Sequence, residues 1–101
     1  MIFADLEYDE HYSEFHAKLV AVIESRFSDV RSGLQGDSWV WIFDGEDKVA
    51  VDTFTAMHHQ IKCRARNLPL LHSVIDVLSR EFCVRRRAEP ELESHEDDRH
   101  R

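Results

Sequence analysis

The hydrophobic residues near the start of the chain recur at spacings of three and four residues. The stripe extends from about Asp9 to Phe27 and consists of Tyr12, Phe15, Leu19, Val22, Ile23 and Phe27. A period near 3.6 residues predicts an amphipathic helix with one face in the core. Asp9 is its expected N-cap, and Glu14 lies near the positive end of the helix dipole, where carboxylates are favoured. The next segment, Ser28–Asp37, has glycines among polar residues, which predicts a loop.

Between Ser38 and Thr55 the period changes to two, which predicts two strands joined by a tight turn. The first strand places Trp39, Trp41 and Phe43 on one face, and on the other Val40 and Ile42. Gly45 suits the turn, because hairpin turns require a positive φ that glycine adopts freely. A strand that is apolar on both faces must be covered on both. In a chain of 101 residues, the second cover is either another part of the same fold or a partner.

The alternation of the second strand begins at Val49 and nominally continues to Cys63. A straight strand of that length would reach roughly 50 Å at about 3.3 Å per residue, which is too long for a domain of this size. We therefore expect a bend, a bulge or a break near Ala56–His59. A break would make His58–Ala65 a third strand.

A second helix is predicted to begin at Asn67–Pro69, since proline is tolerated in a first turn. Its apolar stripe consists of Leu71, Val74, Ile75, Leu78 and Phe82. Asp76 and Arg80 are spaced to form an i,i+4 ion pair on its outer side. Phe82–Arg86 is predicted to be a short final strand. From residue 89 onward the sequence has no hydrophobic period, which is typical of a disordered segment.

These elements define an α+β domain with the order α-β-β-α-β. We expect a small, mostly antiparallel sheet with both helices packed on one face. A right-handed connection through the second helix would return the last strand beside the first, giving the order 2-1-3 with Trp39–Phe43 in the centre. The domain is predicted to span residues 1–88, followed by a disordered acidic tail over residues 89–101.

The net charge of −7 is unevenly distributed along the chain. Residues 1–57 carry twelve acids and four bases, residues 58–88 two acids and seven bases, and residues 89–101 six acids and two bases. This asymmetry indicates electrostatic contacts between parts of the fold or with a partner. No run approaches the roughly 20 apolar residues of a membrane span, and the acidic start does not resemble a secretory signal. A cytoplasmic protein with Cys63 and Cys83 reduced, and no membrane association, is expected.

The sequence leaves two interpretations open for the row Trp39, Trp41 and Phe43. The favoured one places this row in the core under the helices, because large aromatic side chains are mostly buried. Val40 and Ile42 would then form the outer patch. The other interpretation places the aromatic side chains outside, as a binding platform. Either way one apolar row faces away from the helices, so all five residues are candidates for binding a protein partner or a second copy in a homodimer.

His58, His59 and Cys63 form the one cluster with the chemistry of metal ligands. Zinc takes three or four such ligands, and neighbouring residues of a strand point in opposite directions. The set is therefore incomplete, and no cofactor is expected. The motifs GxSxG, HExxH, the P-loop and the glycine-rich dinucleotide signature do not occur, which favours a protein that is not an enzyme. We keep a metal-dependent or catalytic protein centred on these three residues as one alternative hypothesis.

Another alternative hypothesis, binding of nucleic acid, is based on a group of basic residues. Its members are Lys62, Arg64, Arg66, Arg85, Arg86 and Arg87. Together with aromatic side chains on a sheet, they could hold nucleic acid through stacking and phosphate contacts. The net negative charge opposes a polyanion, and acids from residue 89 onward could lie back over the arginines. The sequence thus favours a small acidic protein-interaction module that is not an enzyme, with nucleic acid as the less favoured partner.

Overall fold

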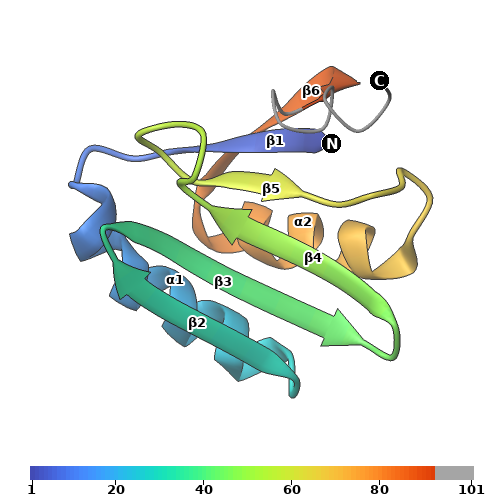
Figure 1. The fold of residues 1–101 in the computed structure, drawn as a ribbon, viewed down its shortest axis with the longest axis horizontal. Helices are drawn as coiled ribbons and strands as arrows, with labels where there is room; N and C mark the ends of the chain where they lie inside the picture. The colour runs from blue at the N-terminus through green and yellow to red at the C-terminus, as the bar shows by residue number, and fades with distance from the viewer. Residues whose placement is uncertain (93–101) are drawn as a thin grey trace.

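The structure is a computed structural model that describes residues 1–92, and it confirms the predicted α+β class (Figure 1). Its elements in chain order are β1 (Ile2–Glu7), α1 (Tyr12–Arg26), β2 (Val30–Gln35), β3 (Asp37–Asp44), β4 (Asp47–Asp52), β5 (Gln60–Lys62), α2 (Pro69–Glu81) and β6 (Cys83–Glu91). The six strands form one antiparallel sheet in the order β2-β3-β4-β5-β1-β6. β1 therefore lies inside the sheet, while β2 and β6 are its edges.

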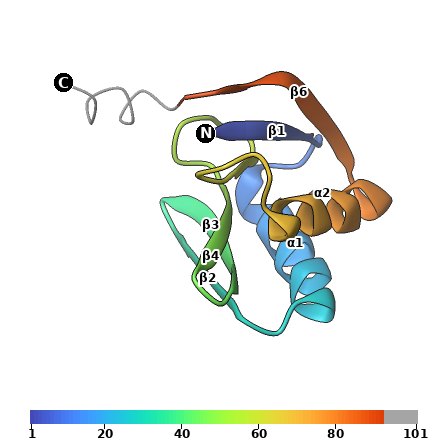
Figure 2. The ribbon, with the colours of Figure 1, turned by 90° about the vertical axis from the view of Figure 1, so that its right-hand side faces the viewer.

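Both helices lie on the same side of the sheet, as the sequence predicts (Figure 2). α1 packs on β2 and β3, α2 packs on β4 and β6, and the two helices contact each other. The sheet curls around them, so the core fills its concave side. Buried helix side chains in this core include Phe15, Leu19, Ile23, Leu71, Val74 and Leu78. Neither helix of the described chain is long and apolar enough to cross a membrane.

α1 begins later than the sequence predicts, because His11 rather than Asp9 is its N-cap. The backbone N–H of Ser13 donates a hydrogen bond to Nδ1 of His11 at 3.2 Å. This bond satisfies one of the first N–H groups, which have no partner within the helix. The histidine ring thus takes the place that the sequence assigns to an acidic side chain.

β1 has a sequence signal that is short and easily overlooked. Apolar Ala4 and Leu6 alternate with charged Asp5 and Glu7, which is the pattern of a strand with one buried face. The high density of acids in the first ten residues hides this pattern when the segment is considered as a whole. β1 is therefore absent from the strand order that the sequence predicts.

β2 lies within Ser28–Asp37, so the loop predicted there is wrong. Gly33 sits inside the strand, and Gly36, with a φ of +78°, forms the turn into β3. The glycines are compatible with a strand here because every residue of β2 is paired along β3. Tertiary pairing of this kind outweighs weak strand propensity.

The predicted order 2-1-3, with Trp39–Phe43 in the centre and the last strand beside it, is also wrong. β6 pairs with β1 at one edge, while β3 lies between β2 and β4 near the other. The unpredicted β1 is the reason, since it supplies the strand that joins β5 to β6.

The long alternation after the hairpin is broken, as expected from its length. β4 ends at Asp52, and the chain leaves the sheet over residues 53–59 before returning as β5. We call residues 53–59 the β4–β5 loop. The third strand is thus shorter than His58–Ala65. At the other end, β6 continues to Glu91 and takes in part of the predicted tail 89–101. Leu92 follows the strand, and residues 93–101 of that tail lie outside the described residues.

The row of β3 side chains that lies under the helices is not the one that the favoured interpretation places there. Val40 and Ile42 have no exposed surface and lie under the helices, so the aromatic row Trp39, Trp41 and Phe43 faces outward, half-buried. β4 explains the choice, because its residues on the side of Val40 are Val49 and Val51, whereas those on the side of the aromatic row are Lys48, Ala50 and Asp52. Charged groups cannot enter an apolar core without partners, so this side turns out.

Gly33 allows the aromatic row to lie flat on the sheet. It is paired with Trp39, and a Cβ atom at position 33 would come within 2.5 Å of the indole ring. No real Cβ contact is that short, so any other residue would push the indole away. The absence of a side chain at position 33 therefore fixes the orientation of Trp39.

We expect Gly33→Ala to displace the Trp39 ring and to lower the free energy of unfolding. Overpacking costs about 1–3 kcal/mol, which exceeds the gain of about 0.4–1 kcal/mol from a less flexible unfolded chain. Urea denaturation measures the loss, and near-UV circular dichroism reports the contact between the indoles. Ser32→Ala, at the next and exposed position, is the matched control. Equal stability and equal spectra for both variants would contradict this account of Gly33.

Candidate functional site

The aromatic row is an ordered surface with two cations beside it. The ring centroids of Trp39 and Trp41 are 4.4 Å apart. The guanidinium of Arg31 lies 5.5 Å from the ring centroid of Phe43, and the Lys48 ammonium 4.6 Å from that of Trp41. Both distances fall in the range of cation–π attraction. The cations therefore lie over the rings and leave the row only partly covered.

The other half of the outer side of the sheet is covered by the β4–β5 loop. Beneath it, Lys62 and Asp52 form a buried ion pair with 2.5 Å between Nζ and Oδ1. The loop residue Thr55 hydrogen-bonds Gln60 at 2.9 Å and accepts a hydrogen bond from Lys62 at 3.2 Å. Its Phe54 side chain is half-exposed. The open part of the outer side is thus confined to β2, β3 and the facing side of β4.

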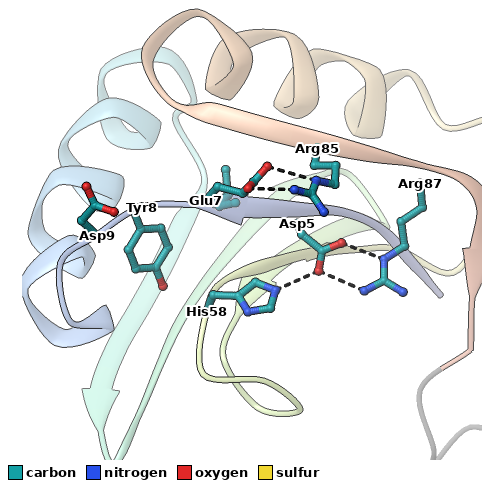
Figure 3. A pocket seen from close by; sticks show the side chains of 8 residues that line it. Asp5, Glu7, Tyr8, Asp9, His58, Arg85 and Arg87 are labelled. Carbon is teal, nitrogen blue, oxygen red and sulfur yellow. Dashed lines mark hydrogen bonds and ion pairs between the residues drawn. The ribbon is translucent and has the colours of Figure 1, made fainter.

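Beside the loop, β1 and β6 border an open charged cleft of about 670 Å³ (Figure 3). Arg85 forms two hydrogen bonds with the Glu7 carboxylate, at 3.0 and 2.9 Å. Arg87 does the same with Asp5, at 2.8 and 2.9 Å. His58 approaches the same Asp5 carboxylate from the loop, with 2.9 Å between Nε2 and Oδ1. The charges of the cleft therefore neutralise one another across the two strands.

The environment of Asp5 explains why this carboxylate stays ionised. The hydrogen bond from Arg87 holds the pKa of Asp5 well below its ordinary value and outweighs the opposing effect of burial. Gln60 and His58 contribute in the same direction through their own hydrogen bonds to this carboxylate. Asp5 is thus the centre of the contacts that attach the β4–β5 loop and β6 to β1.

The basic residues that the sequence proposes for nucleic acid are mostly engaged with carboxylates. Lys62 is buried against Asp52, while Arg85 and Arg87 pair with β1 as described. Arg64 lies 3.7 Å from Asp47, and Arg66 lies 3.9 Å from Glu89. Arg87 also contacts Glu91. Arg86 is exposed on β6. The predicted return of acids from residue 89 onward over the arginines therefore holds for Glu89 and Glu91.

His58, His59 and Cys63 are not brought together as a metal site. His58 contacts Asp5 at the cleft, His59 is fully buried, and Cys63 is buried with its N–H donating to the carbonyl of Met1. Across residues 1–92 there is no group of three or more side chains placed to hold a metal ion. Both histidines belong to the β4–β5 loop rather than to a strand, so the strand alternation expected for them does not apply, and the early end of β5 at Lys62 leaves Cys63 outside the strand.

A chain of four polar side chains crosses the protein from the cleft to α1. The Tyr8 hydroxyl lies 2.7 Å from Nδ1 of His59 and accepts a hydrogen bond from the His59 backbone N–H at 3.0 Å. Nε2 of His59 lies 2.7 Å from Oγ of Ser38, which lies 2.6 Å from Nδ1 of His16. The three hydrogen bonds are all satisfied if the Tyr8 hydroxyl donates to His59, the His59 ring N–H donates to Ser38 and the Ser38 hydroxyl donates to His16. This assignment keeps both imidazoles neutral.

Burial supports the neutral state of these histidines. Desolvation lowers the pKa of His59 to about 4, with repulsion from His16 and His58 acting in the same direction. Desolvation also lowers the pKa of His16. The hydrogen-bonded pair Ser38–His59 has the residue types of a nucleophile and its base, but Ser38 has no exposed surface. A substrate cannot reach the hydroxyl, so the chain of polar groups is structural.

None of the residues that meet at the cleft or in the polar chain forms a motif in the sequence. Tyr8, His16, Ser38 and His59 come from four separate segments, and only the fold brings them together. The one usable signal is the alternation in β1, which would have placed Asp5 and Glu7 side by side on one face. Comparisons with protein-family models, with curated proteins and with solved structures find no match for this chain.

The polar chain predicts that the protein loses stability as the pH falls from 7 to 4. The pKa of His59 is about 4 in the folded protein and ordinarily 6.5, so the unfolded chain binds the proton first and folding is opposed in that window. The loss from His59 alone is about 3 kcal/mol in the free energy of unfolding and is complete below the folded pKa. Below about pH 4, protonation of Asp5 adds a further loss, since its folded pKa is depressed.

Urea denaturation at pH 7, 5.5 and 4 tests this expectation. His59→Gln should flatten the dependence on pH, although the variant is less stable at pH 7. His72→Gln, at an exposed position of α2, is the matched control and should follow the wild-type curve. Parallel curves for wild type and His59→Gln would show that another group causes the loss.

Proposed function

We propose that this chain is a small protein-interaction module without enzymatic activity, which docks a basic protein partner on the outer side of its sheet. The observation that carries the proposal is the aromatic row, half-buried on the side that the helices leave open. Exposed apolar patches with polar surroundings commonly mark protein interfaces. Tryptophan is also among the residues that most often dominate binding energy.

The side chains of the aromatic row are held in place by their neighbours, which favours binding by a surface that is already formed. Trp39 rests on Gly33 and contacts Trp41, so its indole is held before a partner arrives. A side chain that is already ordered loses little conformational entropy on association. Lys48 and Arg31 lie over the rings with flexible stems, and such stems can move aside or pack against a partner.

The charge around the row favours a basic partner. Residues 29–52, which include β2, β3 and β4, carry six acids and two bases. Both bases lie over the rings of the row, which leaves the acids for the strand ends and for the turn between β3 and β4. Asp52 is buried against Lys62 and Asp47 lies 3.7 Å from Arg64, so the negative charge available to a partner comes from the other four acids. Opposite charges on a partner would steer the encounter and fix its orientation more than they would raise affinity. Free thiols at Cys63 and Cys83 support a cytoplasmic location for this interaction.

Binding of single-stranded nucleic acid is the second candidate, because exposed aromatic side chains next to cations suit base stacking. It ranks lower because phosphates would have to displace carboxylates from Arg85 and Arg87 on β6. Among residues 1–92 only Arg31 and Lys48 lie at the row itself, while the whole chain carries a net charge of −7. Such a field repels a polyanion.

Replacing an aromatic side chain of the row with a small one should weaken binding of the protein partner. We expect Trp41→Ser to weaken partner binding by about tenfold or more, as for a central interface residue. Met57→Ser is the matched control, since Met57 is also exposed and apolar but lies on the β4–β5 loop. Partners are captured from an extract of the source organism with all three baits, identified, and purified. Titration calorimetry with the purified partner then measures affinity and its dependence on salt.

Equal binding of the purified partner by wild type and Trp41→Ser would contradict the assignment of the row. An acidic partner would contradict the charge argument. If wild type alone associates through the row, so that Trp41→Ser makes it monomeric, the occupant is a second copy and the basic partner is wrong.

A fluorescently labelled single-stranded oligonucleotide separates the two candidates. We expect no change in its anisotropy at about 0.1 M salt, because the field of the protein is repulsive at this ionic strength. Tight binding that weakens steeply with salt and is lost in Trp41→Ser would favour nucleic acid over protein.

A further inference from the structure

The edge of the sheet formed by β2 has unpaired backbone groups at alternate residues. The Phe43 N–H donates to the carbonyl of Asp29 at 2.9 Å, which makes this a hydrogen-bonded pair of the antiparallel ladder. Such pairs alternate along a ladder, so Arg31 and Gly33 also point their backbone groups at β3. The N–H and C=O groups of Val30, Ser32 and Leu34 then point away from the sheet. Within residues 1–92 no strand pairs with this edge.

The two edges of the sheet differ in how they are protected. β6 carries three consecutive arginines, Arg85–Arg87, and Pro90. Charges and proline on an edge strand discourage pairing with another chain. β2 has no proline and one charged residue, Arg31. Its Leu34 side chain is 42% exposed, on the side of the sheet that carries the helices. β2 is therefore the edge open to a further strand.

The sequence of β2 is complementary to itself in one antiparallel register. With Ser32 opposite Ser32 of a second copy, Val30 faces Leu34 of that copy, and all the outward-pointing backbone groups are paired. Cross-strand apolar pairs stabilise a sheet, and this one covers the exposed Leu34. A shift by one ladder position in one direction would set Arg31 opposite Arg31, where like charges repel. The opposite shift would set Leu34 opposite Ser32 and leave Val30 without a partner.

We propose that the chain forms a two-fold symmetric dimer in which β2 pairs antiparallel with β2 of a second copy, with the axis at Ser32. The dimer continues one sheet through both subunits. On its outer side Arg31 faces Gly33 of the second copy, where no side chain stands between it and the Trp39 indole that rests there. The guanidinium can then lie against that indole as a cation–π contact between subunits.

This dimer places the two aromatic rows side by side on one surface and leaves both open. It does not depend on the partner proposed for the row, because the contact uses the edge of the sheet rather than its face. A single strand pair is a small interface, so we expect a dissociation constant in the micromolar range rather than a permanent dimer.

The position of the axis allows a charge-swap test. A residue on a two-fold axis meets its own copy, so Ser32→Lys places two ammonium groups together, and Ser32→Asp places two carboxylates together. Ser32 is exposed in the single subunit, so both variants should keep their fold, which far-UV circular dichroism checks. Sedimentation velocity over a concentration series should give a dimer for wild type and about a tenfold weaker one for each variant. An equimolar mixture of the variants should restore the dimer as a hybrid of the two.

Recovery in the mixture supports the proposal, since a variant that had merely misfolded would not recover. A wild-type chain that is monomeric at about 0.5 mM would overturn it. So would a dimer that persists in Ser32→Lys, or one that is lost in both variants and absent from their mixture. Trp41→Ser keeps the edge and should keep the dimer, so its loss in that variant would also overturn the proposal. Because Trp41→Ser and Ser32→Lys affect different surfaces, failure of this inference is distinct from failure of the proposed partner.

Discussion

Two helices on one side of a six-stranded sheet leave the other side without a second layer, and this constraint shapes the rest of the molecule. Side chains alternate along a strand, so the row that meets the helices forces its neighbours outward. In β3 the row of Val40 and Ile42 fits under the helices because β4 adds valines beside it. The bulkier tryptophans are left on the open side, where the helices do not cover them.

The open side itself has two halves with different chemistry. Over β5 and β1, the β4–β5 loop and arginines of β6 close the surface with ion pairs, including the buried pair of Lys62 with Asp52. Over β2 and β3 the surface carries the aromatic row with Arg31 and Lys48 over its rings, and the β4–β5 loop contacts β3 through Thr53. The ion pairs of the first half connect β4 with β5, and β1 with both β6 and the β4–β5 loop. The second half carries the aromatic row, which the fold leaves half-buried.

The helices, the hairpin of β3 with β4 and the break before β5 follow from hydrophobic period, turn chemistry and length. The sheet order does not, because it depends on β1, whose short alternation lies among acids, and on β2, whose strand state comes from its pairing with β3. The sequence selects Trp39–Phe43 as the candidate segment but favours the wrong row as the outward one, because the direction depends on the neighbouring charges of Lys48 and Asp52. The polar chain through Ser38 and His59 unites four segments and has no local signal.

The position of β1 between β5 and β6 has a consequence for synthesis on the ribosome. Asp5 can form its ion pair with Arg87 only after a further 82 residues have been synthesised. In contrast, β2, β3 and β4 are joined by short turns and pair with strands that are close in the sequence. Translation proceeds at about 5–20 residues per second, so the first strand emerges about 4 to 16 s before its last neighbour. During that interval Ala4 and Leu6 have no complete sheet to enter. The nascent chain therefore exposes the apolar face of β1 before the strands that flank it have been made.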